Sequence, residues 1–261
     1  GKIKLTNQEI FETALKQSAA DLHCTPDDFL RGENVVVLSR ASDKARKYLS
    51  LPFDCNLVSY GNNIVASARE DLADVVRAYI DRYPVEHCFE TPNLHVLNDA
   101  LQRRDLRLCF MAEYFLPDLK KLKAPPCDFD LKILFPKDFC RFYTPAWSNA
   151  LCEKRKELDV VAVGAFEGEK LVGLAGASAD CEKMWQIGID VLPSYRRRGI
   201  ASALTGRLAL EILDRGKVPF YCAAWSNIPS VRNATASGFF PAWVELTAKS
   251  REFVNAMNEK F

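Results

Sequence analysis

The stretch "YRRRGIASAL", residues 195–204, has the residue types of an anion-binding site. Three consecutive arginines, Arg196, Arg197 and Arg198, precede Gly199 and a run of small and apolar residues. Positive charge at a helix N-terminus costs roughly 0.3–1 kcal/mol per charge, because it opposes the helix dipole. When an anion is bound there, the arginines stabilise the site instead of costing free energy. The pattern therefore predicts a phosphate site, with a solvated basic surface as the alternative.

The elements around the arginines favour the phosphate site. The strand pattern "MWQIGIDVL" ends before Pro193, and we expect the arginine stretch to open a helix that runs to about Arg215. Such a strand–loop–helix unit presents free backbone N–H groups to a ligand. Gly199 has no Cβ, so a ligand can approach the backbone closely. The sequence has neither the Gly-Lys-Ser/Thr of a P-loop nor the three-glycine dinucleotide fingerprint.

This stretch resembles the acyl-CoA-binding motif of the GNAT N-acetyltransferase superfamily. "IDVLPSYRRRGIASAL" has the Val-x-Pro strand end followed by Arg-x-x-Gly-x-Ala. A second match is "NIPSVRNATASGFF", which has Asn227, Ser230 and then Gly238-Phe239 in the family's order. The resemblance covers about residues 128–247.

The resemblance implies that acetyl-CoA, or another acyl-CoA, is the co-substrate and that no metal is needed. Backbone groups around Ile189 and Val191 would hold the pantetheine arm, and amides after the strand would bind the pyrophosphate. For Asn227 a plain helix cap is an equally good and compatible interpretation. The implied cofactor-binding residues are Ile189, Val191, Arg196, Arg197, Arg198, Gly199, Ile200, Ala201, Ser202, Asn227 and Ser230.

The catalytic groups of the family are less well matched. The tyrosine that many relatives use as an acid falls on Ala234, and Tyr221 is the candidate substitute, with a core aromatic as the alternative. The position of the glutamate base in some relatives is Trp185, which cannot accept a proton. Glu182 and Asp190 are the nearest carboxylates and the candidate bases; the alternatives are a solvated Glu and a structural Asp.

Hydrophobic patterning predicts the fold class. Strands are expected at residues 130–135, 159–179 (a hairpin turning at 167–169), 184–192, 218–225 and 240–248, with helical segments at 136–155, 195–215 and 226–238. This order predicts an α/β, GNAT-like domain at 126–261, with a mixed, mostly antiparallel sheet flanked by helices. Residues 1–125 are predicted to form a further α/β domain, with a degenerate GNAT copy as one hypothesis. The Pro- and Lys-rich residues 120–130 are the expected linker.

Composition narrows the partners and the compartment. A length of 261 residues favours two domains, and a net charge of +1 argues against a nucleic-acid or membrane partner. No apolar run approaches a membrane span, and the N-terminus lacks the apolar core of a signal peptide. The nine cysteines include no Cys-x-x-Cys pair, and the three histidines lack metal-ligand spacing. We therefore expect a cytoplasmic protein without a metal; the oligomeric state is not indicated.

Two functional hypotheses follow. The first is an acyl-CoA-dependent N-acyltransferase that moves acetyl to a primary amine, on a small molecule or a peptide, by direct attack. The second is a CoA-binding sensor or interaction protein with a GNAT fold and little or no transferase activity.

Overall fold

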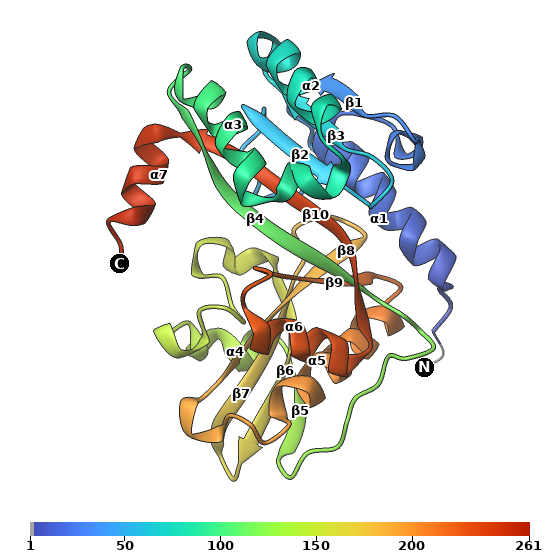
Figure 1. Ribbon diagram of the computed structural model, residues 1–261. Coiled ribbons are helices and arrows are strands. Elements are labelled where there is room, and N and C mark those ends of the chain that lie inside the picture. The colour runs from blue at the N-terminus through green and yellow to red at the C-terminus, as the bar shows by residue number, and fades with distance from the viewer. Residues whose placement is uncertain (1–2) are drawn as a thin grey trace. The chain divides into compact units, whose positions relative to one another are not determined.

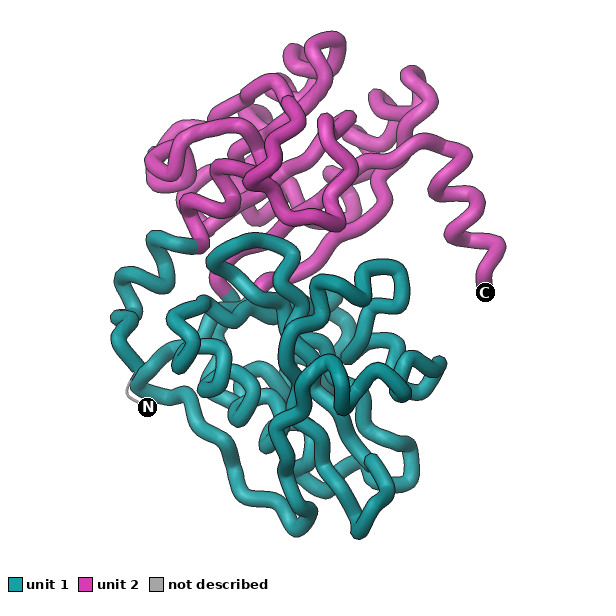
Figure 2. Tube along the Cα trace, turned by 180° about the vertical axis from the view of Figure 1, so that it is seen from behind, with its two compact units in different colours: residues 1–13, 115–241 teal, residues 14–114, 242–261 magenta. Residues whose placement is uncertain are grey.

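The computed structural model describes residues 3–261, which form two compact units (Figures 1 and 2). Of the described residues, the first unit comprises 3–13 and 115–241, and the second comprises 14–114 and 242–261. These limits differ from the domain ranges 1–125 and 126–261 expected from the sequence. Whether those ranges are separate domains stays a prediction.

The first unit is built on a mixed sheet whose neighbouring strands run in the order β9-β8-β7-β6-β5. Neighbouring strands from β5 to β8 pair in antiparallel fashion, and β9 pairs parallel to β8. The mixed, mostly antiparallel sheet with flanking helices expected from the sequence is thereby confirmed. The strands are β5 (Asp130–Leu134), β6 (Asp159–Glu167), β7 (Lys170–Ser178), β8 (Met184–Val191) and β9 (Val218–Ala223).

Two helices of this unit, α5 (Ile200–Asp214) and α6 (Ile228–Ser237), pack on the core of the sheet. Apolar residues of α5 that recur every three to four positions, such as Leu204, Leu208 and Ile212, are buried there. The helical region expected over 136–155 is instead the short helix α4 (Pro136–Phe139) and separate 3-10 turns. A proline within that region, Pro145, cannot donate a helical hydrogen bond. The turns are Cys140–Phe142, Pro145–Trp147 and Glu153–Leu158.

The second unit is also α/β. Its strands lie in the order β1-β3-β2-β10-β4, where β1 is parallel to β3 and β2 is antiparallel to both β3 and β10. The strands are β1 (Val35–Leu38), β2 (Cys55–Ser59), β3 (Val65–Ala68), β4 (Leu106–Pro117) and β10 (Phe239–Ser250). The helices are α1 (Asn7–Leu22), α2 (Ala73–Arg82), α3 (Thr91–Gln102) and α7 (Arg251–Asn258), with 3-10 turns at Pro26–Leu30, Glu70–Leu72 and Val85–Phe89.

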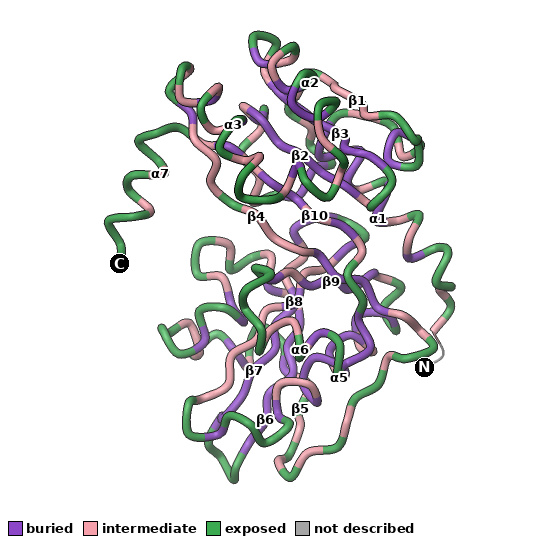
Figure 3. The backbone as a smooth tube through the Cα atoms, in the orientation of Figure 1, coloured by how far each residue is buried: buried purple, intermediate pink, exposed green. Residues whose placement is uncertain are grey.

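Each unit has its own apolar core. In the second unit α2 buries Val76, Tyr79 and Ile80 against β2 and β3, whose residues are buried on both faces (Figure 3). Three elements, α1, β4 and β10, have residues in both units. No helix within residues 3–261 is long and apolar enough to cross a membrane.

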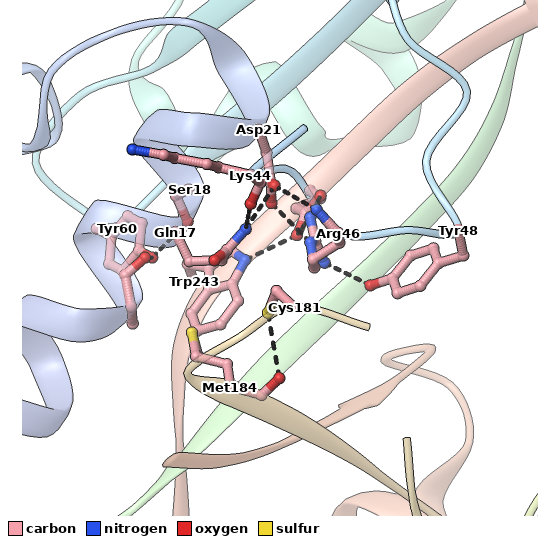
Figure 4. Close-up of polar contacts among 12 residues, drawn as sticks. Gln17, Ser18, Asp21, Lys44, Arg46, Tyr48, Tyr60, Cys181, Met184 and Trp243 are labelled. Carbon is pink, nitrogen blue, oxygen red and sulfur yellow. Dashed lines mark hydrogen bonds and ion pairs between the residues drawn. The ribbon is translucent and has the colours of Figure 1, made fainter. Parts of the chain in front are cut away.

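The second unit also buries a charged cluster (Figure 4). Arg46, only 4% exposed, donates from Nε to Asp21 at 2.6 Å and from Nη2 to both oxygens of Glu245 at 2.9 Å. Trp243 Nε1–H donates to Glu245 at 2.9 Å, and Arg46 Nη1 donates to the hydroxyl of Tyr48 at 2.6 Å. The cluster joins α1, β10 and the segment between β1 and β2, and its two carboxylates outnumber its one cation.

Candidate functional site

The site begins where β8 and β9 stop pairing. The parallel register runs from Met184–Val218 to Gln186–Phe220 and ends there, although β8 continues to Val191 alongside β7. Two parallel strands that pair at their starts and separate afterwards leave a gap between them at their carboxyl ends. Ligands of open α/β sheets commonly bind at such ends.

The hydrogen-bond pattern of β8 determines which backbone groups face this gap. Leu192 N–H donates to Val172 O at 2.9 Å, and Val218 N–H donates to Lys183 O at 2.8 Å. In these ladders the even-numbered residues of β8 bond to β7 and the odd-numbered residues face β9. Ile189 and Val191 therefore direct their N–H and C=O groups toward β9, beyond the last paired residues. These are the two residues predicted from the sequence to hold pantetheine.

The arginine loop, residues 196–199, connects this strand end to α5. The expectation that the arginines open the helix is wrong, because α5 begins at Ile200 with Gly199 as its N-cap. Arg197 has φ = 64° and Gly199 has φ = 76°, both left-handed and incompatible with a helix. Arg196, before them, is extended, with φ = −67° and ψ = 157°. Successive backbone N–H groups in a turn of this kind face one side and make an anion-binding concavity. The arginines therefore precede the first helical turn.

The three arginines differ in their surroundings. The guanidinium of Arg198 lies 4.8 Å from the ring centre of Phe129 and 5.5 Å from that of Tyr195. Tyr195 is held in turn by its hydroxyl, which donates to Glu167 at 2.8 Å. All three arginines are exposed, and Arg198 differs from the other two in that its guanidinium stacks on these two rings.

The first turn of α5 supplies further amides. Its first helical hydrogen bond runs from Ala203 N–H to Gly199 O at 3.2 Å. The amides of Ile200, Ala201 and Ser202 precede that bond and have no acceptor within the helix. Space around Gly199 is open, since a Cβ built there would meet nothing within 4 Å. The loop and the helix start fit a pyrophosphate, which accepts hydrogen bonds and carries negative charge.

The residues of the second motif lie at the start of α6. Asn227 caps the helix, and its side-chain oxygen accepts from Ser230 N–H at 3.4 Å. The helix-cap interpretation of Asn227 thus agrees with the structure, and contact with pantetheine stays a prediction. Ser230 Oγ lies 2.6 Å from the hydroxyl of Tyr221, on β9.

Tyr221 is a buried tyrosine whose hydroxyl is part of a polar network. The hydroxyl also lies within hydrogen-bond distance of Ser230 O, at 3.1 Å, and accepts from Asn233 Nδ2 at 3.5 Å. Asn233 Nδ2 also donates to Thr205 Oγ1 on α5 at 2.8 Å. The Tyr221 ring packs edge-on against Phe115. The core-aromatic interpretation of Tyr221 thus agrees with the structure, and its role as the substitute acid stays a prediction.

The two predicted carboxylates occupy different places. Asp190 accepts three hydrogen bonds of 2.8 Å, from the backbone N–H groups of Asn149 and Ala150 and from Asn149 Nδ2. Glu182 is exposed in the turn before β8, and the strand residues from Met184 to Asp190, which span about 20 Å, separate it from Asp190. The structure does not bring these two carboxylates together. Ala234, at the usual acid position, is fully buried in the core.

On the face of β8 opposite α5 lie Gln186 and Gly188, which the sequence motifs did not predict as site residues. Gln186 Nε2 donates to Cys222 Sγ at 3.3 Å, just where β8 and β9 begin to separate. A Cβ at Gly188 would lie 1.9 Å from Asn149 O, so the segment around Asn149 covers this face closely. Side chains alternate along β8, so Gln186, Gly188 and Asp190 lie on one face. This shared face could have been predicted from the sequence.

No group of three His, Cys, Asp or Glu side chains within residues 3–261 is arranged to hold a metal ion. No two of the nine cysteines form a disulfide.

Comparison with known proteins bears on this geometry. The GNAT acetyltransferase family model matches residues 117–241. A putative GNAT acetyltransferase from Novosphingobium aromaticivorans is 18% identical, with a TM-score of 0.44, over 55% of this chain and 66% of its own. A GCN5-related N-acetyltransferase-like protein from Streptococcus suis is 20% identical, with a TM-score of 0.46, over 61% of this chain and 69% of its own. A GCN5-related N-acetyltransferase from Kribbella flavida is 13% identical, with a TM-score of 0.47, over 60% of this chain and 62% of its own.

At these TM-scores the solved structures add no argument to the family match. A search of curated proteins finds no match to the sequence. The family match lies within the range where the sequence resembles GNAT proteins, and it includes the arginine loop and both helices of the site. The C-terminal half of the chain, at residues 117–241, is a GNAT acetyltransferase domain.

Proposed function

We propose that the protein is an acyl-CoA-dependent N-acyltransferase, which transfers acetyl from acetyl-CoA to a primary amine of a small molecule or a peptide. The observation that carries the proposal is the separation of β8 from β9 directly before the arginine loop. A family match in the same residues supports the acyl-CoA class of donor.

In this proposal the chain holds the donor mostly through its backbone. The N–H and C=O groups of Ile189 and Val191 bind the amide groups of pantetheine as a neighbouring strand would. The amides from Arg197 to Ser202 bind the pyrophosphate, and Arg196 and Arg197 add charge. Asn227 and Ser230 border the pantetheine at the start of α6. Acyl-CoA supplies the activated acyl group, and a metal has no role in the proposal.

The chemistry is direct transfer. The neutral amine nitrogen forms a bond to the acyl carbon, the carbon–sulfur bond breaks, and the thiolate takes up a proton. Tyr221 is the proposed proton donor, since Ser230 and Asn233 hold its hydroxyl beside the gap. Both oxygens of Asp190 already accept hydrogen bonds, so we propose that water, rather than a carboxylate, relays the amine proton to solvent.

The donor site is tested by thermal unfolding with acetyl-CoA. A ligand at about one hundred times its Kd stabilises a protein by about 2.7 kcal/mol, so the melting temperature of the wild type should rise. Gly199→Glu should abolish the rise, because its carboxylate and side chain occupy the anion site. Gly216→Glu is the matched control: it also has a left-handed φ, 74°, with open space around it, at the other end of α5.

Both variants should lose similar stability without ligand, and the control alone should keep the ligand-induced rise. Absence of a rise in the wild type would refute the donor site. A panel of amines screened for acetyl-CoA consumption then tests transfer. Binding without turnover on any amine would instead support a CoA-binding sensor or interaction protein.

A further inference from the structure

The sequence predicts a linker at residues 120–130, but the segment 118–124, here called the lysine segment, is fixed to the first unit. Asp118 N–H donates to Gly238 O at 3.0 Å, and Lys123 N–H donates to Ser237 O at 3.2 Å. Between them a turn forms, in which Lys121 and Leu122 both donate to Asp118 O at 2.9 and 2.8 Å. The segment is thus tied at both ends to the C-terminus of α6.

Two glycines allow the backbone of the lysine segment to lie directly against the helices. A Cβ at Gly206 of α5 would lie 1.9 Å from Lys123 O, and a Cβ at Gly238 would lie 2.5 Å from Lys121 O. Such distances leave no room for a side chain, so the contacts are backbone to backbone. The lysine segment is therefore held in a defined position on α5 and α6.

This position is close to the arginine loop. Gly206 lies five residues after Ala201, which is about 7.5 Å along α5. Ser237, which accepts from Lys123, also donates from Oγ to Ser202 O at 3.4 Å in the first turn of α5. After the lysine segment the chain continues to Phe129, whose ring stacks on Arg198 of the loop. The same stretch of chain thus contacts α5 at Gly206 and the loop at Arg198.

The lysine segment brings positive charge to that place. Lys120, Lys121 and Lys123 are exposed, and the ion pairs found within residues 3–261 do not include them. The carboxylate of Asp118 accepts from Lys120 N–H and from Asn7, and these bonds lower its pKa. In a chain of net charge +1, this is a local excess of cations beside a site that already has Arg196 and Arg197.

We propose that the lysine segment binds the phosphate monoester on the ribose 3′-oxygen of coenzyme A, and so makes the site selective for CoA over 3′-dephospho-CoA. The inference rests on the proposed donor site. Coenzyme A carries this second anionic group one ribose away from its pyrophosphate. The arginine loop is placed for the pyrophosphate, and the lysine segment presents separate cations further along α5. Lysine is a suitable partner, since its ammonium binds phosphate as a point charge without a fixed geometry.

The test compares CoA with 3′-dephospho-CoA by titration calorimetry on the full chain. The wild type should bind CoA about tenfold more tightly, because two exposed lysine–phosphate contacts of about 0.7 kcal/mol each give that ratio. Lys121→Gln/Lys123→Gln should reduce the ratio toward one by weakening CoA alone. Lys137→Gln/Lys154→Gln is the matched control, which removes two exposed lysines of the same unit from α4 and the turn Glu153–Leu158. Its ratio should equal that of the wild type.

The outcomes separate this inference from the donor site itself. Equal binding of the two ligands by the wild type, or an equal loss of both in the lysine variant, would overturn the inference and leave the donor site standing. Failure of the wild type to bind either ligand would overturn both. The ratio should also fall as salt is raised, since exposed charges are screened over about 10 Å at 0.1 M. A ratio independent of salt would contradict a role for the lysines.

Discussion

The hydroxyl oxygens of Tyr221 and Ser230 lie 2.6 Å apart, one on β9 and the other on α6. This contact couples a buried phenol to the helix whose start borders the proposed pantetheine site. Position 234, where many GNAT proteins have tyrosine, is a buried alanine. A tyrosine on the neighbouring strand thus brings a hydroxyl to the same helix.

We expect Tyr221→Phe to lower kcat by about one-hundredfold while the KM for acetyl-CoA stays nearly unchanged, since general acid catalysis contributes at least that factor. The measurement uses the best acceptor from the amine panel. Ser230→Ala keeps the phenol and removes its neighbour, so its loss of kcat should be smaller. Equal activity of Tyr221→Phe and the wild type would exclude Tyr221 as the donor.

We expect Asp190 to position the segment at Asn149 and Ala150 and not to act as the catalytic base. Asp190→Ala leaves three donors of Asn149 and Ala150 without their acceptor and should cost about 1–3 kcal/mol of the free energy of unfolding in urea. Asp190→Asn keeps one carbonyl oxygen, so it should retain more stability and most of the kcat. If Asp190→Asn were stable but inactive across the pH range, the carboxylate would be the base.

Gly206→Ala tests the contact between α5 and the lysine segment. Alanine is favoured over glycine in a helix interior by about 1 kcal/mol. Here its Cβ would collide with Lys123 O, so we expect a loss of stability in spite of the higher helix propensity. The same variant should bind CoA and 3′-dephospho-CoA with more similar affinities. A gain in stability would show that the lysine segment does not lie on α5.

The buried cluster of the second unit predicts a pH dependence. Burial, the largest influence, raises the pKa of Asp21 above its ordinary value of 3.8, although Arg46 acts in the opposite direction. A carboxyl group with a raised pKa binds its proton more tightly in the folded protein. Its contribution to stability is therefore fully present below the unfolded pKa and is lost as pH rises through the folded pKa.

Asp21→Asn has no such titration. The free energy of unfolding of the wild type, minus that of Asp21→Asn, should therefore decrease as pH rises from about 4 through the raised pKa of Asp21. Urea unfolding at a series of pH values measures this difference. An increase with pH would mean that the Arg46 pair dominates and the pKa of Asp21 is lowered.

Local sequence patterns predicted the elements whose signals lie within a few residues. The hairpin of β6 and β7 has alternating strands around Gly168, and Gly216 and Gly238 end α5 and α6 with left-handed backbones. The turn of the arginine loop was missed, because a positive φ at Arg197 is unusual for a residue with a Cβ. Its consequence, that the helix starts at Ile200, depends on the loop conformation.

Contacts between residues far apart in the sequence could not be predicted from local patterns. The groups that donate to Asp190 lie about forty positions earlier, and the partners of the lysine segment, Gly206 and Gly238, lie more than eighty positions later. Prolines and lysines predicted a linker because they interrupt periodicity. Backbone contacts against a glycine leave no periodic signal, so no pattern in these residues indicates that the segment is fixed.

The alternation along β8 has a consequence for hydrogen exchange. Amide hydrogens of Gly188 and Asp190 are in the ladder with β7 and should exchange slowly, whereas those of Ile189 and Val191 have no strand partner and should exchange quickly. One strand thus alternates between protected and unprotected amides. A ligand that binds its edge should slow exchange at the odd positions and leave the even positions unchanged, so that β8 itself reports occupancy without any assay of turnover.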